Sequence, residues 1–552
     1  MALIDWLIVL GLNGAVIVYG FYLARGTKTS SEWFLGSRAL PWWLVGLSMF
    51  ATNIDNADVV SATGATFTSG LNILVVHTLG STSGALLAAF CIVPAMYRAG
   101  LYTNAEYLEM RFGPSMRILS GLIQIQYRTN VLGLMIWSVY LLLQHVVGME
   151  PPWAWTLIIS MALLSGAYTA WGGLRAVVVT DALQAIIMMI GAGVVFFAVH
   201  QAAGGWHAML EKLATIDPAQ APGLEVAHPS DLAHISSFRG EQGNVPVAVV
   251  IMGWIIIGSG YWSVNHTQTM RLMGSRSLWD MKLAAVVGVG VSIPIVLVST
   301  SLGLYGRALF PDFTPSDGIY PHLAATYLGP GFKGLVVAAI IAAAMSTFDS
   351  MGSALSALFT RDIYARLIAK DRDDGHYVKV SRFATIGIFA LGFAYLPFIQ
   401  SKPTMLEAFR SLIPVFVTPL FGVYLIGTLT NAPRRSGIIA LLCGAAYGVL
   451  ALYDREFQLT WMPDVLTTSW TALICSLVLT LTGGLVASLL LPSQAGELVS
   501  QAATGWLGRT RETLPDVKEH PFKRPVPFVL QPLLHALALL AVSAYLVFGI
   551  FW

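Results

Sequence analysis

The chain has 552 residues, of which 56% are hydrophobic and only 11% are charged, and its mean hydropathy is +0.70. Its formal net charge of +2 provides no strongly basic surface, so we expect no nucleic-acid partner. Many separated apolar runs of roughly 18 residues or more, without the short alternation of a β-barrel, predict an all-α polytopic protein embedded in the lipid bilayer.

The predicted spans begin close to the first residue. Because the N-terminus lacks a basic segment and a cleavage site, residues 3–24 are expected to be a membrane helix and not a removed signal peptide. About fourteen spans are predicted, at residues 3–24, 41–69, 71–97, 118–147, 153–172, 176–200, 246–270, 283–306, 335–364, 381–400, 404–432, 436–453, 467–492 and 529–551.

Three connecting segments are long. Those at 201–245 and 307–334 contain the amphipathic stretches Trp206 to Leu213 and Tyr320 to Leu328, which predict short surface helices. The third, 493–528, is polar and contains several prolines, and we expect it to be a tether to a peripheral last span.

Basic residues indicate the orientation. Most of the 31 lysine and arginine residues, Arg271 among them, fall in every second loop of the predicted topology. Cytoplasmic loops carry such an excess. We therefore expect a multi-pass protein of the cell membrane with both termini outside the cytoplasm.

Two predicted spans are interrupted by polar residues or glycine. Residues 41–69 contain Asn53, Asp55, Asn56 and Asp58, and residues 246–270 contain Gly258, Gly260, Asn265, His266 and Gln268. Interrupted spans at corresponding positions of two halves are typical of inverted-repeat transporters. We therefore predict two inverted five-helix repeats whose first and sixth core helices are broken. The expected units are a peripheral N-terminal helix in 1–40, repeats at 41–200 and 246–432, an extracellular loop at 201–245, and peripheral C-terminal helices in 433–552.

The apolar run at 335–364 carries many oxygens. Ser346, Asp349, Ser350 and Ser353 share one helical face because they are three or four residues apart, and Thr347 lies at its edge. Hydroxyl, carbonyl and carboxylate oxygens are the ligands of hard cations. This face is therefore a candidate cation site.

Five ionisable residues fall within predicted spans, namely Asp55, Asp58, Arg128, Asp181 and Asp349. A charge at the bilayer centre costs at least about 2.5–3.5 kcal/mol, so each should face a polar interior. Asp181 is either a cation ligand or an interfacial carboxylate near Arg175, and Asp349 either a cation ligand or the partner of an arginine. Arg128 is either a counter-ion for an aspartate or a binding group for an anionic substrate.

No GxxxxGK[ST] loop occurs, so energy for transport would come from an ion gradient. No nucleophile–base pair or metal-ligand spacing occurs either, and we do not expect an enzyme.

Five segments together resemble the sodium/solute symporter family, which includes the sodium/glucose, sodium/proline and sodium/sialic acid cotransporters. They are EWFLGSRALPWWLVGLSMFATNI, GLYTNAEYLEMRFG, TAWGGLRAVVVTDALQ, YWSVNHTQTMRLMGSRS and AAAMSTFDSMGSALSALFTRDIY, in this order over residues 1 to about 435. The resemblance implies two inverted five-helix repeats with one helix before them and three after.

The resemblance also implies a sodium site between the first and eighth core helices. Its ligands would be the carbonyls of Ala51, Ile54 and Ala343 and the hydroxyls of Ser346 and Thr347. A second cation site of some members would match Asp181, Ser346, Asp349 and Ser350, although those members have serine in place of Asp349.

For the solute, the resemblance points approximately to Asp58, Thr78, Ser81, Asn265, Ser292 and Glu407. Thr78, Ser292 and Glu407 depart from the side chains that hold a hexose in the family's sugar transporters. Asp58 and Glu407 would suit a polyol, a hydroxylated amine or a cationic solute, whereas Arg128 would suit an acid.

The sequence therefore predicts a sodium-coupled secondary active symporter, expected to be monomeric, that imports a small polar organic solute, such as a sugar or polyol, by alternating access. One alternative is a proton-coupled symporter of the same fold that uses Asp55, Asp181 and Asp349. Another is a solute sensor that no longer transports.

Overall fold

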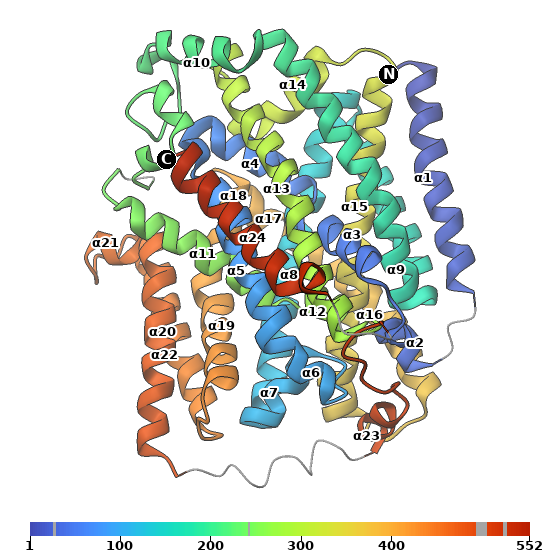
Figure 1. Ribbon diagram of the computed structural model, residues 1–552. Coiled ribbons are helices and arrows are strands. Elements are labelled where there is room, and N and C mark those ends of the chain that lie inside the picture. The colour runs from blue at the N-terminus through green and yellow to red at the C-terminus, as the bar shows by residue number, and fades with distance from the viewer. Residues whose placement is uncertain (26–28, 241–242, 493–504, 523–526) are drawn as a thin grey trace.

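The computed structural model describes residues 1–25, 29–240, 243–492, 505–522 and 527–552, and these residues form helices without any strand (Figure 1). Eleven of the described helices are long and apolar enough to cross a membrane. The number is twelve if α18 (Met405–Ser411) and α19 (Ile413–Leu429), which meet at 49°, form one span. The all-α polytopic prediction is confirmed, whereas the count of about fourteen is not.

Two features account for the lower number. Helix α9 (Pro151–Ala203) has 53 residues and is counted once. At 1.5 Å per residue it would be about 80 Å long, more than twice the thickness of a bilayer core. Gly173, at φ 60° and ψ −162°, interrupts it. The span predicted at 41–69 consists of two helices, each too short to be counted.

The break in the span at 41–69 lies between α3 (Trp42–Asn53) and α4 (Asn56–Ser69), and it has a local cause. The Asp55 carboxylate accepts hydrogen bonds from the backbone N–H groups of Ala57 at 2.8 Å and Asp58 at 3.2 Å. The Asp58 carboxylate accepts one from the Asp55 N–H at 3.1 Å. This reciprocal capping starts a new helix and diverts the Asp55 N–H from the Ala51 carbonyl.

The second predicted break separates α11 (Val247–Val264) from α12 (His266–Met273). The Asn265 side-chain oxygen accepts hydrogen bonds from the Thr267 N–H at 3.0 Å and the Thr267 hydroxyl at 2.8 Å. Both breaks are where the sequence predicts them.

Glycine allows α11 to approach α5 (Ser81–Leu86) and the turn before it very closely. A Cβ atom added to Gly258 would lie 2.5 Å from the Gly80 carbonyl carbon, and one added to Gly84 would lie 2.7 Å from the Gly258 oxygen. Small residues four apart commonly mediate such contacts between membrane helices.

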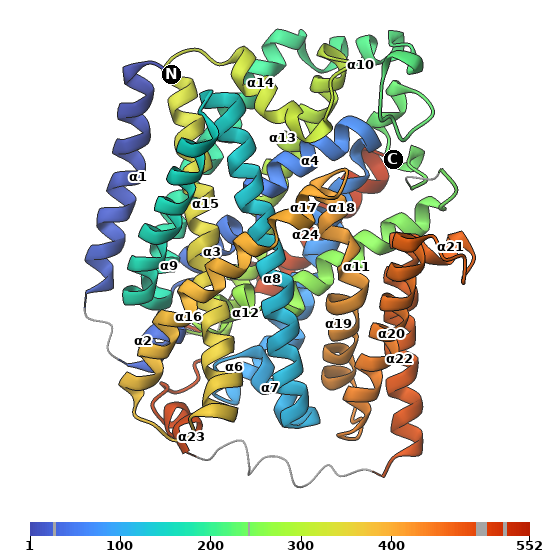
Figure 2. The same cartoon turned by 180° about the vertical axis from the view of Figure 1, so that it is seen from behind.

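Helix α15 (Phe332–Ala357) stands beside α9 and near α1 (Leu3–Ala24), as Figure 2 shows, and α16 (Asp374–Ala394) and α8 (Pro114–Leu142) also pack against it. The helical turns Leu358–Ile368 continue α15, and 94% of an apolar 18-residue stretch of the span Phe332–Ile368 is buried. The share is 28% for α1 and 17% for the span Pro532–Ile550, which begins with α24 (Pro532–Tyr545). The polar face of α15 is therefore in contact with protein and not with lipid.

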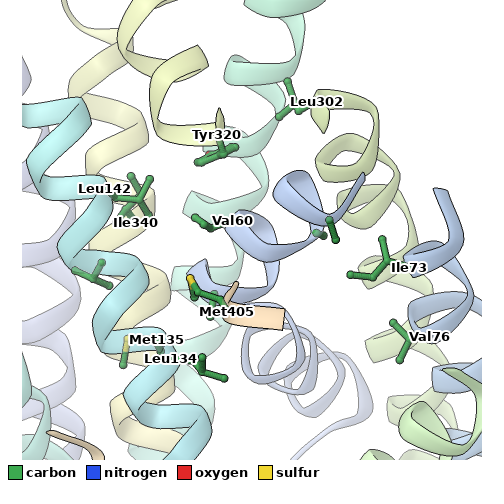
Figure 3. Close-up of a cluster of buried hydrophobic side chains, with 14 of the residues drawn as sticks. Val60, Ile73, Val76, Leu134, Met135, Leu142, Leu302, Tyr320, Ile340 and Met405 are labelled. Atoms are coloured by element: carbon green, nitrogen blue, oxygen red, sulfur yellow. The ribbon is translucent and has the colours of Figure 1, made fainter. Parts of the chain in front are cut away.

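One apolar cluster joins α4, α15 and α8 (Pro114–Leu142). Figure 3 shows Val60, Leu134, Leu142 and Ile340 in this cluster together with Tyr320 from the long loop. These contacts hold α4, the second half of the first broken span, against α15 and α8.

The predicted surface helices are present as α10 (Gly205–Thr215) and α14 (Ile319–Tyr327). The remaining helices are α2 (Ser30–Leu35), α6 (Val93–Arg98), α7 (Asn104–Phe112), α13 (Leu278–Leu309), α16 (Asp374–Ala394), α17 (Leu396–Gln400), α20 (Ser436–Phe457), α21 (Asp464–Thr467), α22 (Ser469–Leu490) and α23 (Gly505–Glu512). Residues 505–522 of the predicted tether pack against the protein, whereas 493–504 and 523–526 lie outside the described residues. The boundaries of the two repeats and the membrane side of each terminus stay predictions.

Candidate cation and solute site

The end of α3 meets the middle of α15. The Ser346 hydroxyl donates to the Ala51 carbonyl at 3.3 Å, and the Thr347 hydroxyl donates to Asp55 Oδ2 at 3.2 Å. Ala51, Ile54 and Ala343 belong to one buried apolar cluster. The structure therefore brings together all five residues predicted to bind sodium. Asp55, which was not among those five, adds a carboxylate from the break itself.

The break supplies the kind of oxygen that a cation site needs. The Ala51 carbonyl has lost its helical donor because the Asp55 N–H bonds to Asp58. The nearby Thr52 carbonyl accepts a hydrogen bond from the Tyr261 hydroxyl at 3.0 Å. Carbonyls at an unwound segment can coordinate a cation without breaking a helix hydrogen bond.

A second polar cluster lies on the next turn of α15. Asp181 of α9 accepts hydrogen bonds from the hydroxyls of Ser346 at 2.7 Å and Ser48 at 2.6 Å. Its Oδ2 also forms an ion pair with Nη2 of Arg271 on α12 at 2.8 Å. Both side chains of the pair are completely buried.

The Arg271 guanidinium joins four helices. Besides Asp181, it donates to the hydroxyls of Ser350 at 2.5 Å and Ser48 at 2.7 Å, and to the Thr267 carbonyl at 2.6 Å. The distribution of basic residues predicts that Arg271 lies in a cytoplasmic loop. Its buried place on α12 follows from the break at Asn265, because this short helix carries it back into the protein. Arg175, considered as the neighbour of Asp181, is exposed.

Asp349 lies on a different side of α15 from this cluster. Its carboxylate accepts a hydrogen bond from the Thr169 hydroxyl at 2.7 Å and others from the hydroxyls of Ser165 and Tyr168. Of the four residues predicted for a second cation site, the structure thus brings Asp181, Ser346 and Ser350 together around Arg271. Among the described residues, no arginine forms an ion pair with Asp349.

A central cavity adjoins the break in the 41–69 span. Of the residues predicted to bind the solute, Asp58 and Ser81 line it. Further lining groups are Thr52, Asn53, Asp55, Ser61, His77, Arg128, Trp254, Tyr261, Met405 and Phe409. Aromatic rings combined with a few polar groups are usual in small-molecule sites.

The other predicted solute ligands lie elsewhere. The Thr78 hydroxyl donates to the Leu74 carbonyl at 2.8 Å, and Asn265 caps α12. Ser292 accepts a hydrogen bond from Asn53 Nδ2 at 3.1 Å. Glu407 lines a separate pocket with Arg410 and Arg455. His77, Trp254 and Tyr261 were not predicted as ligands, since only the packing of α11 against the preceding span turns them toward one space.

Arg128 is a buried cation on the wall of this cavity. Its side chain is 2% exposed, and its guanidinium carbon lies 5.3 Å from the centre of the Tyr261 ring. It forms no ion pair in the described part of the chain, and its Nε has no hydrogen-bond partner there. Its charge nevertheless acts on the carboxylates of Asp55 and Asp58, which line the same cavity, so the counter-ion alternative and the anionic-substrate alternative both stay predictions.

Comparison with solved structures identifies similar folds. The structure of this protein matches that of a sodium-coupled sialic acid symporter solved in a substrate-bound outward-open state. The TM-score is 0.72 and the sequence identity 20%, and the match covers 89% of this chain and 99% of that chain. The structure also matches a transporter of the nucleobase-cation-symport-1 family with a TM-score of 0.53 and 13% identity, over 88% of this chain and all of that one. These matches confirm the fold class.

Sequence comparison identifies relatives among characterised transporters. The chain is 27% identical to sodium/glucose cotransporter 1 of Oryctolagus cuniculus over 465 residues, which are 78% of this chain and 68% of that protein. It is 23% identical to the sodium/sialic acid symporter SiaT of Proteus mirabilis over 466 residues, which are 82% and 90% of the two chains. The model of the Sodium:solute symporter family matches residues 33–442. The chain therefore belongs to the sodium/solute symporter family, whose members are transporters and not enzymes.

Proposed function

We propose that this protein imports a small polar organic solute together with sodium, and that sodium binds where α3 ends against α15. Its ligands are the carbonyls of Ala51, Ile54 and Ala343 and the hydroxyls of Ser346 and Thr347. The observation that carries the proposal is the meeting of the unwound segment after α3 with these two hydroxyls. The proposed solute site is the central cavity next to this sodium site.

Sodium at this position would strengthen the contact between two helices that already meet through hydroxyl groups, Ser346 with the Ala51 carbonyl at 3.3 Å and Thr52 with Ser350 at 2.9 Å. Sodium attracts oxygens of both α3 and α15, so its binding favours the arrangement in which the two helices touch. Its loss to the cytoplasm removes this attraction, which lets the helices separate and the solute leave. Coupling follows because the solute cavity includes Thr52, Asn53 and Asp55 of the same break.

We further propose that the solute carries an acidic group. Arg128 forms no direct ion pair with Asp55 or Asp58, although both carboxylates line the same cavity, so its guanidinium can still donate hydrogen bonds to an acidic group of the solute. Asp58 and Ser81 on the same wall would receive hydroxyl or amine groups. A sugar acid or a hydroxylated amino acid combines both features, and one relative is named for its transport of sialic acid.

The sodium site is tested by uptake into proteoliposomes. Thr347→Ala and Ser346→Ala each remove one ligand, so the sodium concentration for half-maximal uptake should rise roughly tenfold for each. Ser353→Ala is the matched control, because this buried hydroxyl on the same helix donates to the Ser350 carbonyl. Unchanged sodium dependence in both ligand variants would refute the site. Uptake driven by a proton gradient alone would favour the proton-coupled alternative.

The solute class is tested with purified protein. Thermal stability is measured with neutral sugars, polyols, amino acids and sugar acids, each in sodium and in potassium. We expect sugar acids or amino acids to stabilise the wild type in sodium. This stabilisation should be lost in Arg128→Gln and partly kept in Arg128→Lys. Stabilisation by a neutral sugar that survives Arg128→Gln would contradict the acidic solute and leave sodium coupling intact.

A further inference from the structure

The cytoplasmic end of the molecule, as the basic residues orient it, is crossed by a segment from outside the two repeats. Residues 505–522, here called the strap, include α23 and an extended stretch after it. Figure 1 shows α23 at the lower end of the molecule, below α2. The strap lies beyond the residues that the family model covers.

The first half of the strap contacts the continuation of α15 and the start of α16. The Trp506 ring stacks on Tyr377 with 3.8 Å between centroids, and its Nε1 donates to Asp374 at 2.9 Å. The Thr510 hydroxyl accepts hydrogen bonds from the Arg361 guanidinium at 3.3 Å. Arg361 lies on the helical turns Leu358–Ile368, which continue α15 without a break.

The same half also covers a buried ionic cluster. Arg361 pairs with Glu106 of α7 at 2.9 Å, and Glu106 pairs with Arg117 at 3.0 Å. Burial opposes the charge on Glu106, but the neighbouring arginines outweigh it and lower its pKa to about 2. The Thr510 carbonyl accepts a hydrogen bond from the Tyr102 hydroxyl at 2.7 Å, next to this cluster.

The second half of the strap contacts the start of α13. The carbonyls of Lys518 and Glu519 accept hydrogen bonds from the Leu278 and Trp279 N–H groups, both at 2.9 Å. These N–H groups belong to the first helical turn, where donors have no partner within the helix. The Phe522 ring packs on Trp279 with 5.0 Å between centroids.

These two anchor points continue into different helices next to the buried Arg271 cluster. Helix α13 follows α12 after a loop of four residues, and α12 lies below the cavity with Gln268 and Arg271 completely buried. The other anchor continues α15, to which Arg271 donates at Ser350. The strap connects the continuations of α12 and α15, so it would resist any separation of these two helices that opened a route to the cytoplasm.

We propose that the strap holds the cytoplasmic side of the transporter closed and must release one of its two anchor points before sodium and solute can leave. The inference rests on the proposed symport function. The contacts of the strap suit reversible release, because water can replace the hydrogen bonds of its carbonyl and hydroxyl groups at small net cost.

The test is amide hydrogen exchange of the full-length protein in sodium and in potassium. We expect peptides from the strap and from α12 to exchange more slowly in sodium. In Trp506→Ala/Thr510→Val, both segments should exchange roughly tenfold faster in sodium, because a stacked ring pair and a hydrogen bond are lost. Arg509→Ala is the control, since the exposed pair of Arg509 with Asp371 contributes little.

Two results would contradict the proposed role of the strap. In the first, the exchange rate of the strap rises in the double variant while that of α12 stays unchanged. In the second, the exchange rate of α12 differs between sodium and potassium in the wild type while that of the strap does not. Thr510→Val alone supplies a milder change if the double variant does not fold. Sodium-dependent uptake is measured on the same preparations. Its absence in the wild type refutes the proposed function, whereas uptake with an unresponsive strap refutes only this inference.

Discussion

Replacing Arg271 with glutamine removes the cation that neutralises Asp181. The structure shows both side chains completely buried, with 2.8 Å between the guanidinium and the carboxylate. Breaking a buried pair from one side leaves an uncompensated charge and typically costs about 3–5 kcal/mol. We therefore expect Arg271→Gln and Asp181→Asn each to lower the free energy of unfolding by that amount.

The double variant Asp181→Asn/Arg271→Gln provides the decisive comparison. Two neutral amides in the same space leave no buried charge, so the double variant should recover part of the loss, with a coupling energy of about 2–3 kcal/mol. Unfolding is followed in mixed detergent micelles and in potassium, so that sodium binding does not add to stability. Arg98→Gln is the control, because Arg98 and Glu519 form an exposed pair. Additive losses in the double variant would refute the ion pair.

Two further predictions concern helix contacts and pH. Gly258→Leu should lower thermal stability by several degrees, because its side chain would clash with the Gly80 backbone. In the control Gly290→Leu an added Cβ meets only the Leu539 side chain at 3.9 Å, so little loss is expected, and an equal loss in both variants would contradict the contact. Asp317, in the loop before α14, accepts a hydrogen bond from the Met405 N–H at 2.8 Å, and burial raises its pKa from 3.8 to about 6. The folded state then holds the proton more tightly than the unfolded state, so the stability of the wild type relative to Asp317→Asn should fall as the pH rises from about 4 to 6. A melting temperature that changes equally with pH in both proteins over this range would contradict the shift.

Local features of the sequence were sufficient for the broken helices. Asp55 and Asp58 predict a helix start inside an apolar run because their carboxylates can satisfy the first free N–H groups of that helix. Asn265 does the same for α12. Since these interactions join residues only two or three positions apart, they can be inferred without knowing the fold.

Long-range placement decided the partners of the charged residues. Counting basic residues by loop placed Arg271 in the cytoplasm, whereas the structure buries it against Asp181, 90 positions away in sequence. Asp349 shares a helical face with Ser346 and Ser350 in a projection, but rotation of α15 against α9 turns its carboxylate toward Tyr168. Spacing along one helix cannot show which neighbouring helix each side chain meets.

The sequence by itself determined the membrane class, the all-α architecture and both helix breaks, because hydropathy and polar interruptions act over a few residues. The candidate sodium ligands came from the resemblance to a known family. Only the tertiary structure decided that Arg271 neutralises Asp181, that Arg128 faces the solute cavity without an ion pair, and that residues 505–522 close over α13 and α16. Each of these depends on packing between segments that are remote in sequence, where no local pattern records the contact.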